Sequence, residues 1–156
     1  MLEKVLVCLD GSALSEEILP YISGESRHLG KVILVKVVSS PEVNVPLGVP
    51  GETGGAVPTR GRLERFQKEL EETPAYLEEK AQPLREKGLD VECVVLQGVP
   101  SEAIIDYAGD NAVGLIAIAT HGHSGFRQMA LGSTAEFVLK HAGRPVLLVT
   151  PQKHRK

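Results

Sequence analysis

The sequence predicts an α/β protein with five parallel strands and helices on both faces of the sheet. Five short apolar runs, rich in β-branched residues, lack the polar–apolar alternation of half-exposed strands, which is typical of strands covered on both sides. Helical patterns separate successive runs, and right-handed crossovers then give a doubly wound fold. A flavodoxin-like strand order is one natural expectation, and Rossmann-like orders would place a ligand by the same rule, at the carboxyl ends of the strands.

The expected elements follow one another along the chain. Strands are expected at 5–9 and at 32–38, the second interrupted only by Lys36, and a helix from Ser15 to about His28 should lie between them. The later elements are a helix over 62–87 that Pro74 and Pro83 would kink or break, a strand over 90–96, a helix from Pro100, a strand over 114–119, a helix over 133–140 and a strand over 145–149.

The chain of 156 residues suits a single domain, expected over 1–150. Four prolines and five glycines fall between Ser39 and Gly61, so this stretch is expected to be a long, mobile surface loop within the domain. The segment 151–156 contains four basic residues and reads as a solvated tail.

Composition excludes several classes of protein. The net charge of −3 gives no general attraction to nucleic acid, and no run approaches the roughly 20 apolar residues that span a bilayer. The N-terminus turns polar too soon for a signal peptide, and the two cysteines, Cys8 and Cys93, lie inside apolar runs and form no Cys-x-x-Cys pair. We therefore expect a cytoplasmic protein with no nucleic-acid or membrane partner.

The stretch IATHGHSGFRQMALGSTAE, from Ile118 to Glu136, follows the fourth expected strand and allows three interpretations. Residues 122–126 approach the Gly-x-Ser-x-Gly nucleophile elbow, but the fifth residue is Phe126, so no catalytic serine is expected. His121 and His123 could chelate a metal, but a site needs three or four ligands and the sequence offers too few, so no metal is expected either.

A phosphate site accounts for more of this stretch. Gly122 and Gly125 allow turns whose N–H groups converge, and Gly132 precedes a helix whose free N–H groups would attract an anion. The competing interpretation is a capping box from Ser133 to Glu136, which needs no ligand and leaves the glycines unexplained. Neither a P-loop nor a dinucleotide-binding glycine motif is present.

Asp10 ends the first expected strand, and its carboxylate should face the crevice at the sheet edge. It could accept hydrogen bonds from a sugar hydroxyl or a base amino group. Alternatively it caps the first helix, although Ser12 and Ser15 are near enough to do so instead.

With these residues in view, the sequence resembles the universal stress protein family. The family's signature is Gly, two residues, Gly, nine residues, then Gly followed by Ser or Thr; here Ala119 replaces the first glycine, and Gly122 and the pair Gly132–Ser133 match. The resemblance extends over VLVCLDGS, VILVKVV, LQGVPSEAI, IAIATHGHSG and LGSTAEFVLKHAGRPVLLV, which is nearly the whole chain.

The resemblance implies a binding module for ATP or another adenine nucleotide, with any Mg²⁺ held by the phosphates, a stress-response or regulatory role, and a homodimer joined through the last strand. The nucleotide-binding residues that it implies are Cys8, Leu9, Asp10, Val37, Ile118, Ala119, Thr120, His121, Gly122, Gly132, Ser133 and Thr134. Asp10 would contact the ribose or adenine, and Val37 would border the adenine. Gly132, Ser133 and Thr134 would hold the phosphates.

Two departures from the family pattern concern the phosphates. Ala119 adds a methyl group where the family often has glycine, and His123 stands where a basic residue often follows, so AMP or ADP would compete with ATP. No lysine lies in the loop and no carboxylate is evidently placed for Mg²⁺ or for water activation, so the sequence assigns no catalytic residue. A weak ATP-hydrolysing or nucleotidyl-transferring enzyme and a nucleotide-free dimeric interaction module remain alternatives.

Overall fold

The computed structural model describes residues 2–41, 59–120 and 132–150. Within these ranges five strands form one parallel sheet in the order β3-β2-β1-β4-β5. The strands are β1 (Leu2–Leu9), β2 (Leu29–Val38), β3 (Asp90–Gln97), β4 (Leu115–Ala119) and β5 (Val146–Val149). The predicted α/β class is confirmed, but the order is Rossmann-like and not flavodoxin-like, because β1 lies between β2 and β4.

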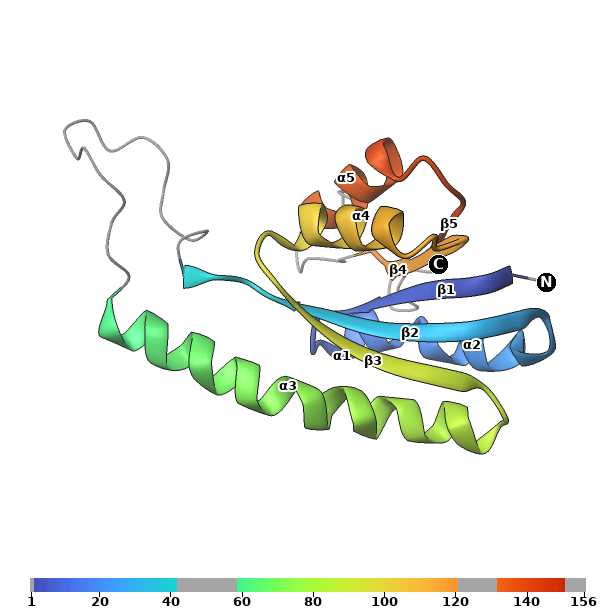
Figure 1. The fold of residues 1–156 in the computed structure, drawn as a ribbon, viewed down its shortest axis with the longest axis horizontal. Coiled ribbons are helices and arrows are strands. Elements are labelled where there is room, and N and C mark those ends of the chain that lie inside the picture. The colour runs from blue at the N-terminus through green and yellow to red at the C-terminus, as the bar shows by residue number, and fades with distance from the viewer. Residues whose placement is uncertain (1, 42–58, 121–131, 151–156) are drawn as a thin grey trace.

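Helices cover both faces of the sheet, as the sequence predicts (Figure 1). They are α1 (Ala13–Glu16), α2 (Leu19–Gly24), α3 (Arg60–Glu86), α4 (Pro100–Asp110) and α5 (Ser133–His141), with a 3-10 turn at Ser26–His28. The buried clusters place α2 and α3 on one face and α4 and α5 on the other, and α1 lies on the side of α2 and α3 (Figure 1). This arrangement makes three layers around a central sheet.

Strand β1 shows why the expected strands lack alternation. Val7 and Leu9 pack on the face that carries α1–α3, whereas Leu6 and Cys8 pack on the face that carries α4 and α5. All four side chains are almost completely buried. Because each face meets a helical layer, every position of the strand favours an apolar residue.

The helix expected from Ser15 to about His28 is wrong as a single element. The chain forms α1, then α2, then the 3-10 turn over the same residues. Pro20 lies in the first turn of α2, where a missing N–H costs nothing, whereas it could not donate within one continuous helix. The proline therefore sets the boundary between the two helices.

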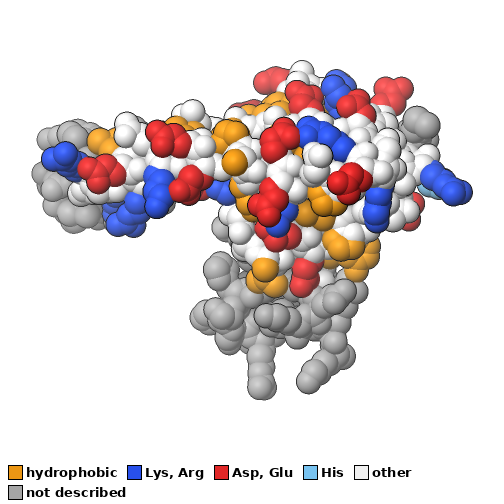
Figure 2. Space-filling view, turned by 90° about the horizontal axis from the view of Figure 1, so that it is seen from below, with side chains coloured by type: hydrophobic (Ala, Val, Ile, Leu, Met, Phe, Trp, Pro, Cys, Tyr) orange, Lys and Arg blue, Asp and Glu red, His pale blue; other side chains and the backbone are white. Residues whose placement is uncertain are grey.

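The expected break in the 62–87 helix is also wrong, because α3 runs without interruption from Arg60 to Glu86. Pro74 and Pro83 both lie on its exposed side, so water can satisfy the carbonyl groups that these prolines leave unpaired. Leu77, with Ala81 and Leu84 further along, holds the helix against the sheet. The N-terminal part of α3 projects beyond the sheet and carries charges of both signs (Figure 2).

The remaining boundaries agree with the expected ones to within a few residues, and α3 takes in the last two residues of the expected 39–61 loop. The rest of that loop from residue 42 to 58, and the basic tail 151–156, lie outside the described residues. In the ranges that are described, no helix combines the length and the apolar character needed to cross a membrane.

Candidate functional site

A cavity of about 230 Å³ opens at the carboxyl ends of β1 and β4. The two strands are neighbours, yet the chain turns in opposite directions from them: β1 leads to β2 on one side, and β4 leads to β5 on the other. Ligands in open α/β sheets bind at such a reversal of winding. The cavity is lined by Cys8, Leu9, Asp10, Ser15, Val35, Val37, Pro100, Ile104, Ile118, Ala119 and Thr134.

The turn that follows β1 presents a carboxylate at the mouth of the cavity. Asp10 is exposed and its Oδ1 accepts a hydrogen bond of 2.8 Å from the backbone N–H of Ser12. The cap of α1 is Ser12, whose Oγ accepts from the N–H of Ser15 at 3.1 Å. The interpretation of Asp10 as the helix cap is therefore wrong, and its carboxylate belongs to the turn.

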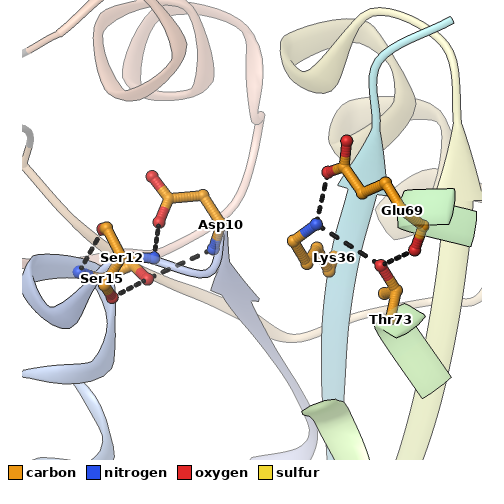
Figure 3. A network of polar contacts seen from close by, with 6 residues as sticks. All are labelled: Asp10, Ser12, Ser15, Lys36, Glu69 and Thr73. Carbon is orange, nitrogen blue, oxygen red and sulfur yellow. Dashed lines mark hydrogen bonds and ion pairs between the residues drawn. The ribbon is translucent and has the colours of Figure 1, made fainter. Parts of the chain in front are cut away.

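Ser15 fixes the same turn from below. Its buried hydroxyl donates to the carbonyl of Ser12 at 2.9 Å and accepts from the N–H of Asp10 at 3.2 Å. Between these residues Gly11 has φ +90°, a backbone conformation in which a residue with a side chain would be strained. The residues Asp10–Ser12, called the Asp10 turn below, are thus held at both ends (Figure 3).

The floor of the cavity is apolar. Val35 and Val37 point to it from β2, Ile118 from β4 and Ile104 from α4. Cys8 completes the floor, and burial raises the pKa of its thiol to about 12. A neutral thiol is a poor nucleophile and a poor metal ligand, so this surface is suited to contact an apolar or aromatic group.

The N-terminus of α5 borders the other side of the cavity. Gly132 precedes the helix with φ +79°, and none of the residues that the structure describes caps the first turn with its side chain. Thr134 lines the cavity. The capping-box interpretation is wrong, because the N-cap is Gly132 and not Ser133, and the Glu136 carboxylate accepts a hydrogen bond of 2.9 Å from Lys140. An uncapped first turn with the positive end of the helix dipole favours an anion at this point.

The structure brings together most of the predicted site residues that it describes. Lining the cavity are Cys8, Leu9, Asp10, Val37, Ile118, Ala119 and Thr134. Gly132 and Ser133 adjoin Thr134 at the start of α5, whereas Thr120 is buried and its N–H bonds the carbonyl of Val149 at 2.9 Å. His121 and Gly122, with His123 and Ser124, lie outside the described residues.

Sequence reasoning missed four lining residues: Ser15, Val35, Pro100 and Ile104. Val35 was within reach, because it lies two residues before Val37 on the same strand and so on the same face. The placement of α4 beside the cavity depends on the strand order, which the sequence left open. Among the described residues, no three His, Cys, Asp or Glu side chains gather closely enough to hold a metal ion.

The pattern of the universal stress protein family matches residues 1–150, which is almost the whole chain. The chain belongs to the universal stress protein family. Its members include MJ0577 of Methanocaldococcus jannaschii, which is 29% identical over 96% of this chain and 95% of its own. Universal stress protein YxiE of Bacillus subtilis is 28% identical over 96% of this chain and 99% of its own.

Solved structures of family members share the fold. A structure of MJ0577 superposes with a TM-score of 0.78 at 27% identity and covers 97% of this chain and 98% of its own. An Arabidopsis thaliana member with AMP bound has a TM-score of 0.63 at 17% identity, covering 96% of this chain and 92% of its own. A universal stress protein in complex with cAMP has a TM-score of 0.64 at 19% identity, covering 95% and 96%.

Proposed function

We propose that this universal stress protein binds an adenine nucleotide in the cavity at the carboxyl ends of β1 and β4 and acts in a regulatory role in the stress response. The observation that carries the proposal is the position of an apolar cavity between a carboxylate at Asp10 and the uncapped N-terminus of α5. Family members with AMP and cAMP bound support the adenine class.

The cavity is large enough for only part of a nucleotide. Its volume of about 230 Å³ is below the roughly 300–1,000 Å³ of pockets that enclose a whole drug-sized ligand, so it suits the base and sugar, with the phosphates outside. The adenine packs between Cys8, Val37 and Ile118, and the Asp10 carboxylate accepts a hydrogen bond from a ribose hydroxyl.

The phosphates then lie at the start of α5. The N–H groups of the first turn, with the hydroxyls of Ser133 and Thr134, donate to the phosphate oxygens. Residues Ile118–Gly122 and Gly132 surround the ribose and phosphates in this proposal. Any Mg²⁺ is held by the phosphates, since the described residues place no metal-binding cluster nearby.

The proposal extends to assembly and location. Strand β5 is an edge of the sheet, and Leu147 on it is 37% exposed, so a second copy can pair there to form a homodimer. We place the protein in the cytoplasm. It is proposed as a binding protein, because the described cavity contains one carboxylate and no second acid or base.

The experiment is to denature the purified protein, identify released nucleotides by mass spectrometry, and titrate the emptied protein with ATP, ADP and AMP. A nucleotide at about 100 times its dissociation constant should add roughly 2.7 kcal/mol to the free energy of unfolding. Steady ATP turnover with Mg²⁺ would favour the enzyme instead. Neither released nucleotide nor any stabilisation would contradict the proposal.

A further inference from the structure

An ion pair with a buried lysine lies on the other face of the sheet, directly behind the cavity. Lys36 of β2 is almost fully buried, and its Nζ is 2.5 Å from Glu69 Oε1 of α3 and 3.4 Å from Thr73 Oγ1 (Figure 3). Lys36 sits between Val35 and Val37, which point to the cavity from the same strand. A lysine in a strand buried on both faces is costly unless its charge is paired, so its presence needs a reason.

The stem of Lys36 supports the Asp10 turn. Lys36 is paired with Leu9 in the register of β1 and β2, and a Cβ added to Gly11 would lie 3.4 Å from Lys36 Cε. The methylene chain therefore packs beneath Gly11, in the middle of the turn. A support of this kind holds the turn only while the ammonium group stays anchored.

The anchor comes from α3. Thr73 donates its hydroxyl to the carbonyl of Glu69 at 2.6 Å, which leaves its lone pairs to accept from Lys36. The Glu69 side chain is 47% exposed, whereas that of Lys36 is 9% exposed. Removal of the Glu69 carboxylate would thus strand a buried ammonium, which would move toward water and draw its stem away from Gly11.

We propose that Lys36 and Glu69 are positioning residues for the Asp10 turn, so that α3 sets how firmly the cavity holds its ligand. The effect on ligand affinity rests on the proposed nucleotide function, whereas the support of the turn by Lys36 does not. A second contact agrees with it: Tyr76 of α3 donates to Glu16 Oε1 at 2.9 Å, in the helix that Ser12 caps. Helix α3 therefore reaches the turn through Lys36 and contacts α1 directly.

The test compares Glu69→Ala with Glu71→Ala, which removes an exposed carboxylate from the same helix. Amide hydrogen exchange of Asp10 and Ser12 is measured without nucleotide, and the dissociation constants for ATP and AMP are measured by calorimetry. We expect Glu69→Ala to speed amide exchange at Asp10 and Ser12. It should also raise both dissociation constants about threefold or more, the usual size of an effect transmitted between residues in one interaction network. Glu71→Ala should change neither the exchange rates nor the dissociation constants.

Further variants decide how the effect arises. Lys36→Met keeps the stem without the charge, so its apolar chain should stay packed beneath Gly11 and leave exchange and affinity near the wild-type values. Lys36→Ala removes the stem, and we expect it to reproduce Glu69→Ala. In an Asp10→Ala background Glu69→Ala should weaken binding no further, because both act through one carboxylate. Unchanged exchange and affinity in Glu69→Ala and Lys36→Ala would overturn the inference. A wild type that binds no nucleotide, with exchange still faster in Glu69→Ala, would overturn only the proposed function.

Discussion

The backbone N–H of Ser12 donates a hydrogen bond of 2.8 Å to the carboxylate of Asp10. One oxygen of the side chain thus shapes the turn, and the exposed group can accept from a ligand as well. The same residue links the local structure of the β1–α1 connection to the proposed recognition of ribose.

Asp10→Ala should weaken adenine-nucleotide binding about tenfold or more, the usual cost of losing a hydrogen bond to a charged acceptor. Asp10→Asn is the matched control, because its amide oxygen can keep the bond from Ser12, and we expect a smaller loss. Isothermal calorimetry measures both. An Asp10→Ala variant with wild-type affinity would place the ribose elsewhere.

Thr134→Asp should abolish or strongly weaken nucleotide binding, because it brings a negative charge to the first turn of α5, beside which phosphate would lie. The fold should survive, since an acidic residue in the first turn of α5 stabilises a helix by about 0.3–1 kcal/mol. Thr134→Asn has the same shape without the charge and should bind more tightly than Thr134→Asp. Equal affinities for the two variants would contradict the phosphate position. Gly132 is a poorer choice, because its φ of +79° would strain any side chain.

Stability should fall at alkaline pH because the Cys8 thiol is buried. Burial raises the pKa of Cys8 from 9.0 to about 12, and that of Cys93 to about 11. Between its unfolded and folded values the Cys8 thiol of the unfolded chain has lost a proton that the folded protein keeps, so the free energy of unfolding decreases by up to about 1.4 kcal/mol per pH unit for Cys8. Below pH 9 the effect disappears.

Urea unfolding at a series of pH values across this range measures how steeply the free energy of unfolding falls with pH. Cys8→Ala should lower stability at every pH through the lost packing. Above about pH 9, however, its free energy of unfolding should fall less steeply with pH, because the contribution of the Cys8 thiol is gone. Parallel pH dependences for the wild type and Cys8→Ala would show that Cys8 does not retain its proton as burial requires.

Leu147→Lys should convert the proposed homodimer into a monomer. The side chain is 37% exposed on the edge strand β5, where a charge disfavours pairing with another chain. Leu63→Lys is the control, since Leu63 is 40% exposed on α3 and away from that edge. Light scattering after gel filtration measures the mass. A Leu147→Lys dimer would exclude this interface.

The fold class could be predicted because its signals are local. Apolar runs such as Val5–Leu9 report strands buried on both faces without knowledge of their neighbours. The strand order could not be predicted, because it depends on which edge of the sheet β4 joins, and that choice is made by packing across the whole sheet. The continuity of α3 through Pro74 was missed for a similar reason, since tertiary packing outweighs the local cost of a proline.

The candidate site was predicted where residues lie at the end of a strand, as Asp10 and Ala119 do. Ser15 and Ile104 were missed because they reach the cavity from helices, and their approach depends on how each helix packs. Lys36 was visible as the polar interruption of a buried strand, but its partner Glu69 lies 33 residues away in a helix full of glutamates. No local pattern identifies which of them pairs with it.

The most direct test of nucleotide binding in this cavity is a titration with AMP followed by the NMR signals of valine, leucine and isoleucine methyl groups. The account predicts that Val37, Ile104 and Ile118, which line the cavity, shift with a saturable dependence on AMP, while Leu77 and Val91 on the opposite face stay in place. Saturating AMP that leaves the three cavity residues unmoved, or that shifts only the opposite face, would contradict it.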